Sequence, residues 1–138
     1  MSKIIDVWFP GGKKVNARIG DMEIKTDQSE KAGGDGSAPE PFQLFLASIA
    51  TCVGIYASEF CTTRQIDTTG MSLRMISDFD QDMKRYIQMT FDLILPSGFP
   101  EKYRNGIRRA MDLCAVKRHM TDPPEFRIET RYPDFEGE

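Results

Sequence analysis

The sequence contains few of the residues that most often build metal sites. It has one histidine and three cysteines in 138 residues, and the cysteines are widely spaced. It has no Cys-x-x-Cys pair, the arrangement typical of zinc sites, so we expect no metal and no cofactor. The odd number and wide spacing also differ from the dense cysteine pattern of secreted disulfide scaffolds. We therefore expect the cysteines to rest as free thiols.

An excess of positive charge is also missing. The chain has 18 lysines and arginines against 21 aspartates and glutamates, which gives a formal net charge of -3 at pH 7. No overall field draws such a protein to nucleic acid, so nucleic acid is not an expected partner. The N-terminus reaches Lys3 and Asp6 before any apolar run long enough for a signal peptide. We expect the protein to be cytoplasmic.

One apolar stretch approaches the length of a membrane span. Residues 41–58 contain no charged side chain, whereas a span needs about 20 residues. Polar residues interrupt the stretch, however, and no second such segment exists, so no membrane is an expected partner. The pattern predicts a helix that is apolar on nearly every face. A chain of this size can hardly enclose such a helix, so we expect a second copy to cover part of it.

Several short segments alternate apolar with polar residues, which predicts antiparallel strands. These segments cover residues 3–9, 14–26, 71–77, 86–95 and 126–132. Helical spacing predicts a second, amphipathic helix from residue 101 to about residues 116–119. The polar, glycine-rich residues 27–40 are expected to form a loop before the first helix. This order predicts a single α+β domain over residues 1–138, with helices packed on antiparallel sheet.

Cys52 and Cys114 lie within the two predicted helices. Cysteines in such positions either pack as small apolar side chains or act as a pair of reactive thiols, and the pattern alone leaves both readings open. Cys61 follows Cys52 on the opposite face of the same helix, so these two cannot form a disulfide and Cys61 is expected to be structural. His119 is close enough in sequence to Cys114 for a Cys–His pair. A solvated, basic helix end is the favoured interpretation of His119.

Two segments carry a family resemblance. The run from Pro41 to Cys52 resembles the lead into the first cysteine of the OsmC/Ohr family, the osmotically inducible and organic-hydroperoxide-resistance proteins. The run from Cys114 to Met120, followed by Pro-Pro-Glu-Phe at 123–126, resembles the second cysteine segment of the OsmC-like branch. The resemblance covers nearly the whole chain. It implies an OsmC-like fold with antiparallel sheets around two central helices, in an intertwined homodimer with active sites at the subunit interface.

The resemblance also implies roles for the cysteines. In peroxidase members of the family, the first cysteine attacks the hydroperoxide and becomes a sulfenic acid, which the second cysteine resolves to a disulfide. Cys52 would then be the peroxidatic thiol and Cys114 the resolving one, with a thiol reductant to recycle them. The family places an arginine, held by a glutamate, near the first cysteine. Arg18 or Lys31 is the candidate cation, and Gln43 stands in the region where the family has its glutamate.

Two functions follow as hypotheses. The first is a thiol-dependent peroxidase that reduces small hydrophobic hydroperoxides in oxidative stress defence, because apolar residues flank Cys52. The second is a non-catalytic dimer that binds a small hydrophobic ligand or acts as a redox sensor. The missing glutamate favours the second hypothesis.

Overall fold

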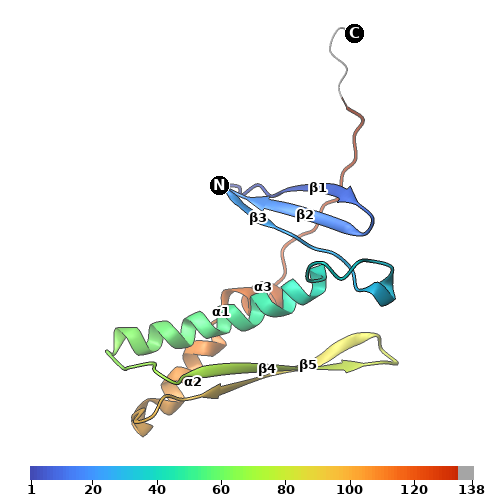
Figure 1. Ribbon diagram of the computed structural model, residues 1–138. Helices are drawn as coiled ribbons and strands as arrows, with labels where there is room; N and C mark the ends of the chain where they lie inside the picture. Colours follow the sequence, from blue (N-terminus) through green and yellow to red (C-terminus); the bar gives the residue numbers. More distant parts are fainter. Residues whose placement is uncertain (134–138) are drawn as a thin grey trace.

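Two antiparallel sheets lie on opposite sides of one long helix (Figure 1). The computed structural model describes residues 1–133. The first sheet has the order β1-β2-β3 and the second is the hairpin β4-β5. In chain order, the elements are β1 (Asp6–Gly11), β2 (Lys14–Ile19), β3 (Met22–Ile24), η1 (Glu30–Ala32), α1 (Pro41–Thr63), β4 (Ser72–Asp80), β5 (Arg85–Ile94), η2 (Glu101–Tyr103), α2 (Arg104–Asp112) and α3 (Ala115–Thr121). The predicted α+β class is confirmed.

The start of α1 is fixed by its own sequence. Pro41 occupies the first helical turn, where its missing N–H costs no hydrogen bond. Glu40 is the N-cap residue, and its backbone N–H donates to Oε1 of Gln43 at 2.9 Å. Together, these contacts form a capping box, which satisfies backbone donors that a helix end otherwise leaves open. The helix therefore begins at Pro41.

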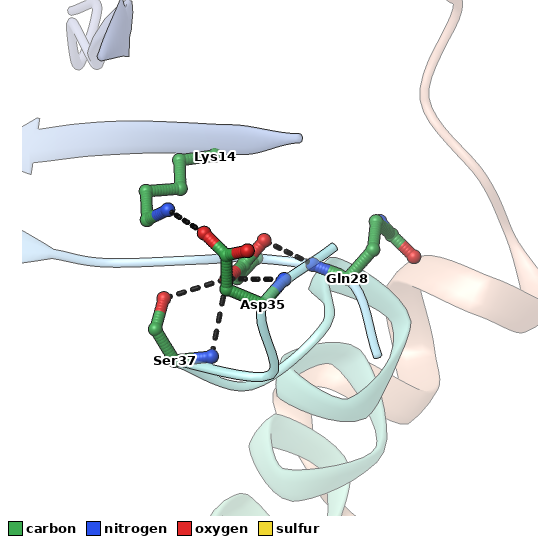
Figure 2. A network of polar contacts seen from close by, with 5 residues as sticks. Lys14, Gln28, Asp35 and Ser37 are labelled. Carbon is green, nitrogen blue, oxygen red and sulfur yellow. Dashed lines mark hydrogen bonds and ion pairs between the residues drawn. The ribbon is translucent and has the colours of Figure 1, made fainter. Parts of the chain in front are cut away.

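The glycine-rich segment before α1 is an ordered loop built around one buried carboxylate. The side chain of Asp27 is fully buried and accepts hydrogen bonds from the backbone N–H of Gln28 at 2.7 Å and of Ser37 at 3.1 Å. The Ser37 hydroxyl donates to the same carboxylate at 2.6 Å, and Asp35 binds Lys14 of β2 (Figure 2). Gly34 is needed because an added Cβ would lie 2.2 Å from the carbonyl oxygen of Gln28. The loop thus links the first sheet to the start of α1.

The core divides into two clusters along α1. Near its C-terminal end, Phe60 and Cys61 pack against Ile107 of α2. Near its middle, Ile49 and Val53 pack against Cys114. The second cluster is the one that brings the two cysteine segments together.

The rest of α1 is not covered within one chain. Only five of its residues are buried: Ile49, Val53, Ala57, Phe60 and Cys61. The chain exposes 11511 Å², whereas a compact monomer of this mass exposes about 7,300 Å². The exposed residues include large apolar side chains, among them Phe42, Ile55, Ile76, Ile87 and Ile94. The predicted burial on all faces is therefore absent in the single chain, as expected if a second copy supplies the missing wall.

The prediction of one continuous second helix is wrong. The structure has a 3-10 turn at η2, then α2, and then a break at Leu113 and Cys114 before α3. Cys114 was expected inside or at the end of a helix, but it is the N-cap residue of α3. Neither proline nor glycine marks this break. Its effect is to turn the chain so that Leu113 is exposed and Cys114 is fully buried.

The predicted last strand, residues 126–132, is also wrong for the single chain. Residues 122–133 have no regular secondary structure, and Phe126, Ile128 and Tyr132 are 84%, 93% and 90% exposed. The segment runs past the first sheet without joining it (Figure 1). The alternating sequence favours a strand, but a strand also requires a neighbouring edge that supplies hydrogen bonds. Within residues 1–133, no such edge pairs with it.

Candidate active site

Cys52 and Cys114 meet where the middle of α1 faces the start of α3. Cys52 is partly exposed on α1, and Cys114 is fully buried. Both thiols are reduced, and Cys52 packs against the core cluster that contains Cys114, so that each side chain shifts the pKa of the other. The structure therefore brings together two cysteines that are far apart in the sequence, as the sequence analysis expected.

The environment of Cys52 favours its thiolate. The largest effect on its pKa is the hydrogen bond that the backbone N–H of Val116 donates to the sulfur, and this lowers the pKa. Burial opposes the shift, but the Cys114 side chain, the N–H of Ala115 and the charge of Arg118 each lower the pKa further. The net pKa is below the ordinary value. These N–H groups belong to the first turn of α3, where the unpaired donors and the helix dipole stabilise negative charge.

Cys114 behaves in the opposite way. Burial is the main cause that raises its pKa, and the hydrogen bond to Cys52 raises it further. A protonated Cys114 donates its S–H to the sulfur of Cys52, so one proton is kept on Cys114 while Cys52 ionises. Cys114 caps the N-terminus of α3, where the helix dipole favours a thiolate, but burial outweighs that effect and keeps Cys114 protonated.

The cation whose charge lowers the pKa of Cys52 in this chain is Arg118, which sequence reasoning missed. Arg118 follows Cys114 by about one helical turn and so returns to the same side of α3. The predicted cations lie elsewhere in the single chain. The guanidinium of Arg18 stacks over the ring of Trp8 at 5.4 Å in the first sheet. Lys31 is exposed in η1.

Gln43 also lies away from the thiols. It is at the third position of α1, where its side chain accepts from the N–H of Glu40. Nine residues separate it from Cys52, which is about 13 Å along the helix axis and on the opposite face. Its contacts in this chain are those of a helix cap.

The other two candidate side chains have structural surroundings. His119 is exposed, and its Nδ1 donates to the carbonyl oxygen of Ala115 at 2.7 Å. These surroundings are those of a solvated helix end. Cys61 is fully buried in the other core cluster, where burial raises its pKa. Within residues 1–133, no group of three or more His, Cys, Asp or Glu side chains could hold a metal ion.

The walls around the thiol pair are apolar. Partly buried side chains that pack there include Phe45, Leu73, Met75, Met89, Phe91 and Met111. Phe45 in turn meets the ring of Phe42 edge-on at 5.2 Å, one turn closer to the start of α1, and Phe42 stacks on Tyr86 of β5 at 5.4 Å. Such surroundings suit an apolar group bound near the sulfur of Cys52.

A family model for OsmC-like proteins matches residues 34–129, which include both cysteines and all three helices. The chain belongs to the OsmC-like family. This match also spans α1, the one helix among the described residues that is long and apolar enough to cross a membrane. We interpret its apolar faces as packing surfaces of this fold. Comparison with curated proteins found no match.

Solved structures share this fold at low sequence identity. A Psychrobacter arcticus protein, described as an osmotic stress induced and detoxification response protein, has a TM-score of 0.72 and 20% identity, over 86% of this chain and 87% of that one. An OsmC-like protein from Mycoplasma pneumoniae has a TM-score of 0.70 and 12% identity, over 89% of each chain. An organic hydroperoxide resistance protein from Legionella pneumophila has a TM-score of 0.59 and 17% identity, over 87% and 89%. The OsmC-like fold is therefore confirmed.

Proposed function

We propose that this chain is a thiol-dependent peroxidase that reduces organic hydroperoxides. The observation that carries the proposal is that the fold places Cys52 and Cys114, which are far apart in the sequence, in one core cluster where their pKa values shift in opposite directions. Cys52 has a lowered pKa and Cys114 a raised one. A two-cysteine peroxidase needs one thiolate that attacks and one nearby thiol that resolves. Organic hydroperoxide resistance among proteins of the same fold supports this choice of substrate.

In the first step, the thiolate of Cys52 attacks the terminal oxygen of the hydroperoxide. The O–O bond breaks, and the leaving alkoxide takes a proton from solvent to become an alcohol. The sulfur of Cys52 gains the hydroxyl group as a sulfenic acid and is oxidised by two electrons. The N–H groups of Val116 and Ala115 support this step, because they keep the sulfur ionised before the attack.

In the second step, the sulfur of Cys114 attacks the sulfenic sulfur of Cys52. A disulfide forms, and the hydroxide leaves as water with the proton of Cys114. A dithiol reductant then restores both thiols and is itself oxidised. Cys114 is suited to this part because it already contacts Cys52 and therefore needs little movement. The cytoplasm is the proposed location, since both resting thiols must be kept reduced.

We also infer a homodimer in which a second copy covers the exposed side of α1. The large exposed area and the uncovered apolar residues of the single chain support this inference. Arg18 and Lys31 stay candidates in this arrangement, because the partner's first sheet could bring either one to Cys52.

The test is the consumption of cumene hydroperoxide with dithiothreitol as the reductant. We expect turnover by the parent chain and none by Cys52→Ser. In a separate reaction without dithiothreitol, Cys114→Ser should consume one equivalent of hydroperoxide and stop with a sulfenic acid on Cys52, which dimedone labels and mass spectrometry detects. Cys61→Ser is the matched control and should keep full activity, because Cys61 lies in the other core cluster. Equal consumption by the parent and Cys52→Ser would refute the proposal.

One observation favours a second function, a non-catalytic binder or redox sensor. The family glutamate has no counterpart at Gln43, whose side chain is used in capping α1. A parent chain that consumes no hydroperoxide, yet forms the Cys52–Cys114 disulfide with one equivalent of oxidant, would be a sensor. A parent chain whose thiols stay reduced would leave ligand binding as the function.

A further inference from the structure

A groove runs between β5 and α2, beside the thiol pair but not lined by either cysteine. It consists of two adjoining hollows of about 180 Å³ each. Three residues line both: Phe91 of β5, and Arg108 and Met111 of α2. Together, the two hollows lie just above the lower size limit of small-molecule sites, about 300 Å³.

The floor of the groove is apolar. In one hollow, the floor is formed by the alternate residues Phe91, Leu93 and Leu95, which share one face of the hairpin opposite Ile107 of α2. In the other, Val53 of α1 closes the end. An extended hydrocarbon chain fits such a floor, because it contacts apolar side chains along its whole length.

The rim of the groove is cationic, although the chain as a whole has a net charge of -3. Arg104 and Arg108 lie one turn apart on α2, so they project from the same face of that helix. Arg104 has a loose and exposed ion pair with Glu101 at 3.6 Å. Within residues 1–133, no carboxylate is within ion-pair distance of Arg108, which is exposed and lines both hollows.

The single carboxylate on the rim is already neutralised. Asp112 is bonded to the ammonium of Lys117, and this bond is the main reason that its pKa is lowered. The charge of Arg108 also acts on Asp112, but with Arg104, Arg108 and Lys117 against one carboxylate the rim keeps a net positive charge. A guanidinium favours a planar, two-oxygen anion, to which it can donate two parallel hydrogen bonds.

We infer that this groove binds a medium-chain carboxylate, with the carboxylate on Arg108 and the hydrocarbon chain on Phe91, Leu93 and Met111. The inference does not depend on the thiol reaction, because the groove is lined by neither cysteine. In this arrangement, Arg108 makes the groove bind an anionic amphiphile more tightly than a neutral one.

The experiment is calorimetric titration of the reduced full-length protein with sodium octanoate. We expect saturable binding, with about tenfold weaker binding of octanoate to Arg108→Gln, since a charge-assisted hydrogen bond is lost. Octan-1-ol, which has the same chain but no charge, should bind the parent more weakly than octanoate does. The control is Arg74→Gln, which removes the same charge from an exposed position on β4, and this variant should bind octanoate as the parent does.

A second measurement tests where octanoate binds. The methyl NMR signal of Met111, assigned with Met111→Leu, should shift on addition of octanoate, because Met111 lines both hollows. Thermal unfolding of each variant checks that it is folded. Three results would overturn the inference: no saturable binding, equal binding by the parent and Arg108→Gln, or an equal loss in Arg74→Gln. If a second copy covers the groove, octanoate will not bind, and this result also overturns the inference.

Discussion

The backbone N–H of Val116, in the first turn of α3, is the main cause that lowers the pKa of Cys52 on α1. The break at Leu113 and Cys114 makes this contact possible. A continuous helix through these residues would use the N–H of Val116 in its own hydrogen-bond ladder, and no donor would be left for the sulfur. The chain therefore activates Cys52 mainly through its backbone, with Arg118 as an added charge.

Replacing Arg118 with glutamine should slow the reaction of Cys52 with iodoacetamide at neutral pH. The positive charge of Arg118 lowers the pKa of Cys52, so its removal raises that pKa and reduces the thiolate fraction. The measurement is the labelling rate as a function of pH, and the curve of the variant should lie at higher pH. The loss should be partial, because the N–H groups of Val116 and Ala115 stay in place.

Arg118→Lys is the matched control, since it retains the charge, and its curve should lie close to that of the parent. Identical curves for the parent and Arg118→Gln would show that Arg118 has no influence on the thiol.

Replacing Ile107 with alanine should lower the free energy of unfolding by about 2–5 kcal/mol, the usual cost of a cavity at a buried isoleucine. Ile107 is 2% exposed and joins α2 to the C-terminal end of α1. Urea unfolding followed by circular dichroism measures the change. Met83→Ala is the control, because Met83 is exposed in the turn between β4 and β5 and should change stability little. A similar loss in both variants would contradict the packing described for Ile107.

The free energy of unfolding should depend on pH through Asp27. Hydrogen bonds from Ser37 and Gln28 lower the pKa of its carboxyl from 3.8 to about 2. Because the folded-state pKa is depressed, the charged Asp27 stabilises the fold above about pH 4, and this stabilisation is lost as the pH falls from 3.8 toward 2. Asp27→Asn should therefore be less stable than the parent at pH 6, and the difference should shrink toward pH 2.

Urea unfolding at several pH values tests this dependence. Asp35→Asn is the control, because Asp35 is exposed and its ion pair with Lys14 lies on the surface. A constant difference between the parent and Asp27→Asn across the pH range would rule out ionised Asp27 as the source.

The sequence predicted the regular elements that have a local signal. Alternating residues placed the strands of both sheets, and the uncharged stretch over residues 41–58 placed α1. No proline or glycine marks the break before Cys114. The break accompanies the burial of Cys114, which depends on tertiary packing and has no local signal in the sequence. The role of Arg118 depends on that break and could not be found without it. Residues 126–132 have the pattern of a strand, but their hydrogen-bond partners are not in the single chain.

The uncovered face of α1 leads to the last prediction. Ile55 is 51% exposed in the single chain, near the centre of a helix that is otherwise apolar. If a second copy covers this face, Ile55→Glu places a charge in the interface without a partner, and the dimer should dissociate. Light scattering coupled to size-exclusion chromatography measures the mass, which should fall from about twice the 15.7 kDa of the chain to that of one chain. Met83→Glu is the matched control, since Met83 lies in the hairpin turn, and it should retain the mass of the parent. A parent that elutes as a monomer, or an Ile55→Glu variant that stays a dimer, would show that this face of α1 is not the interface.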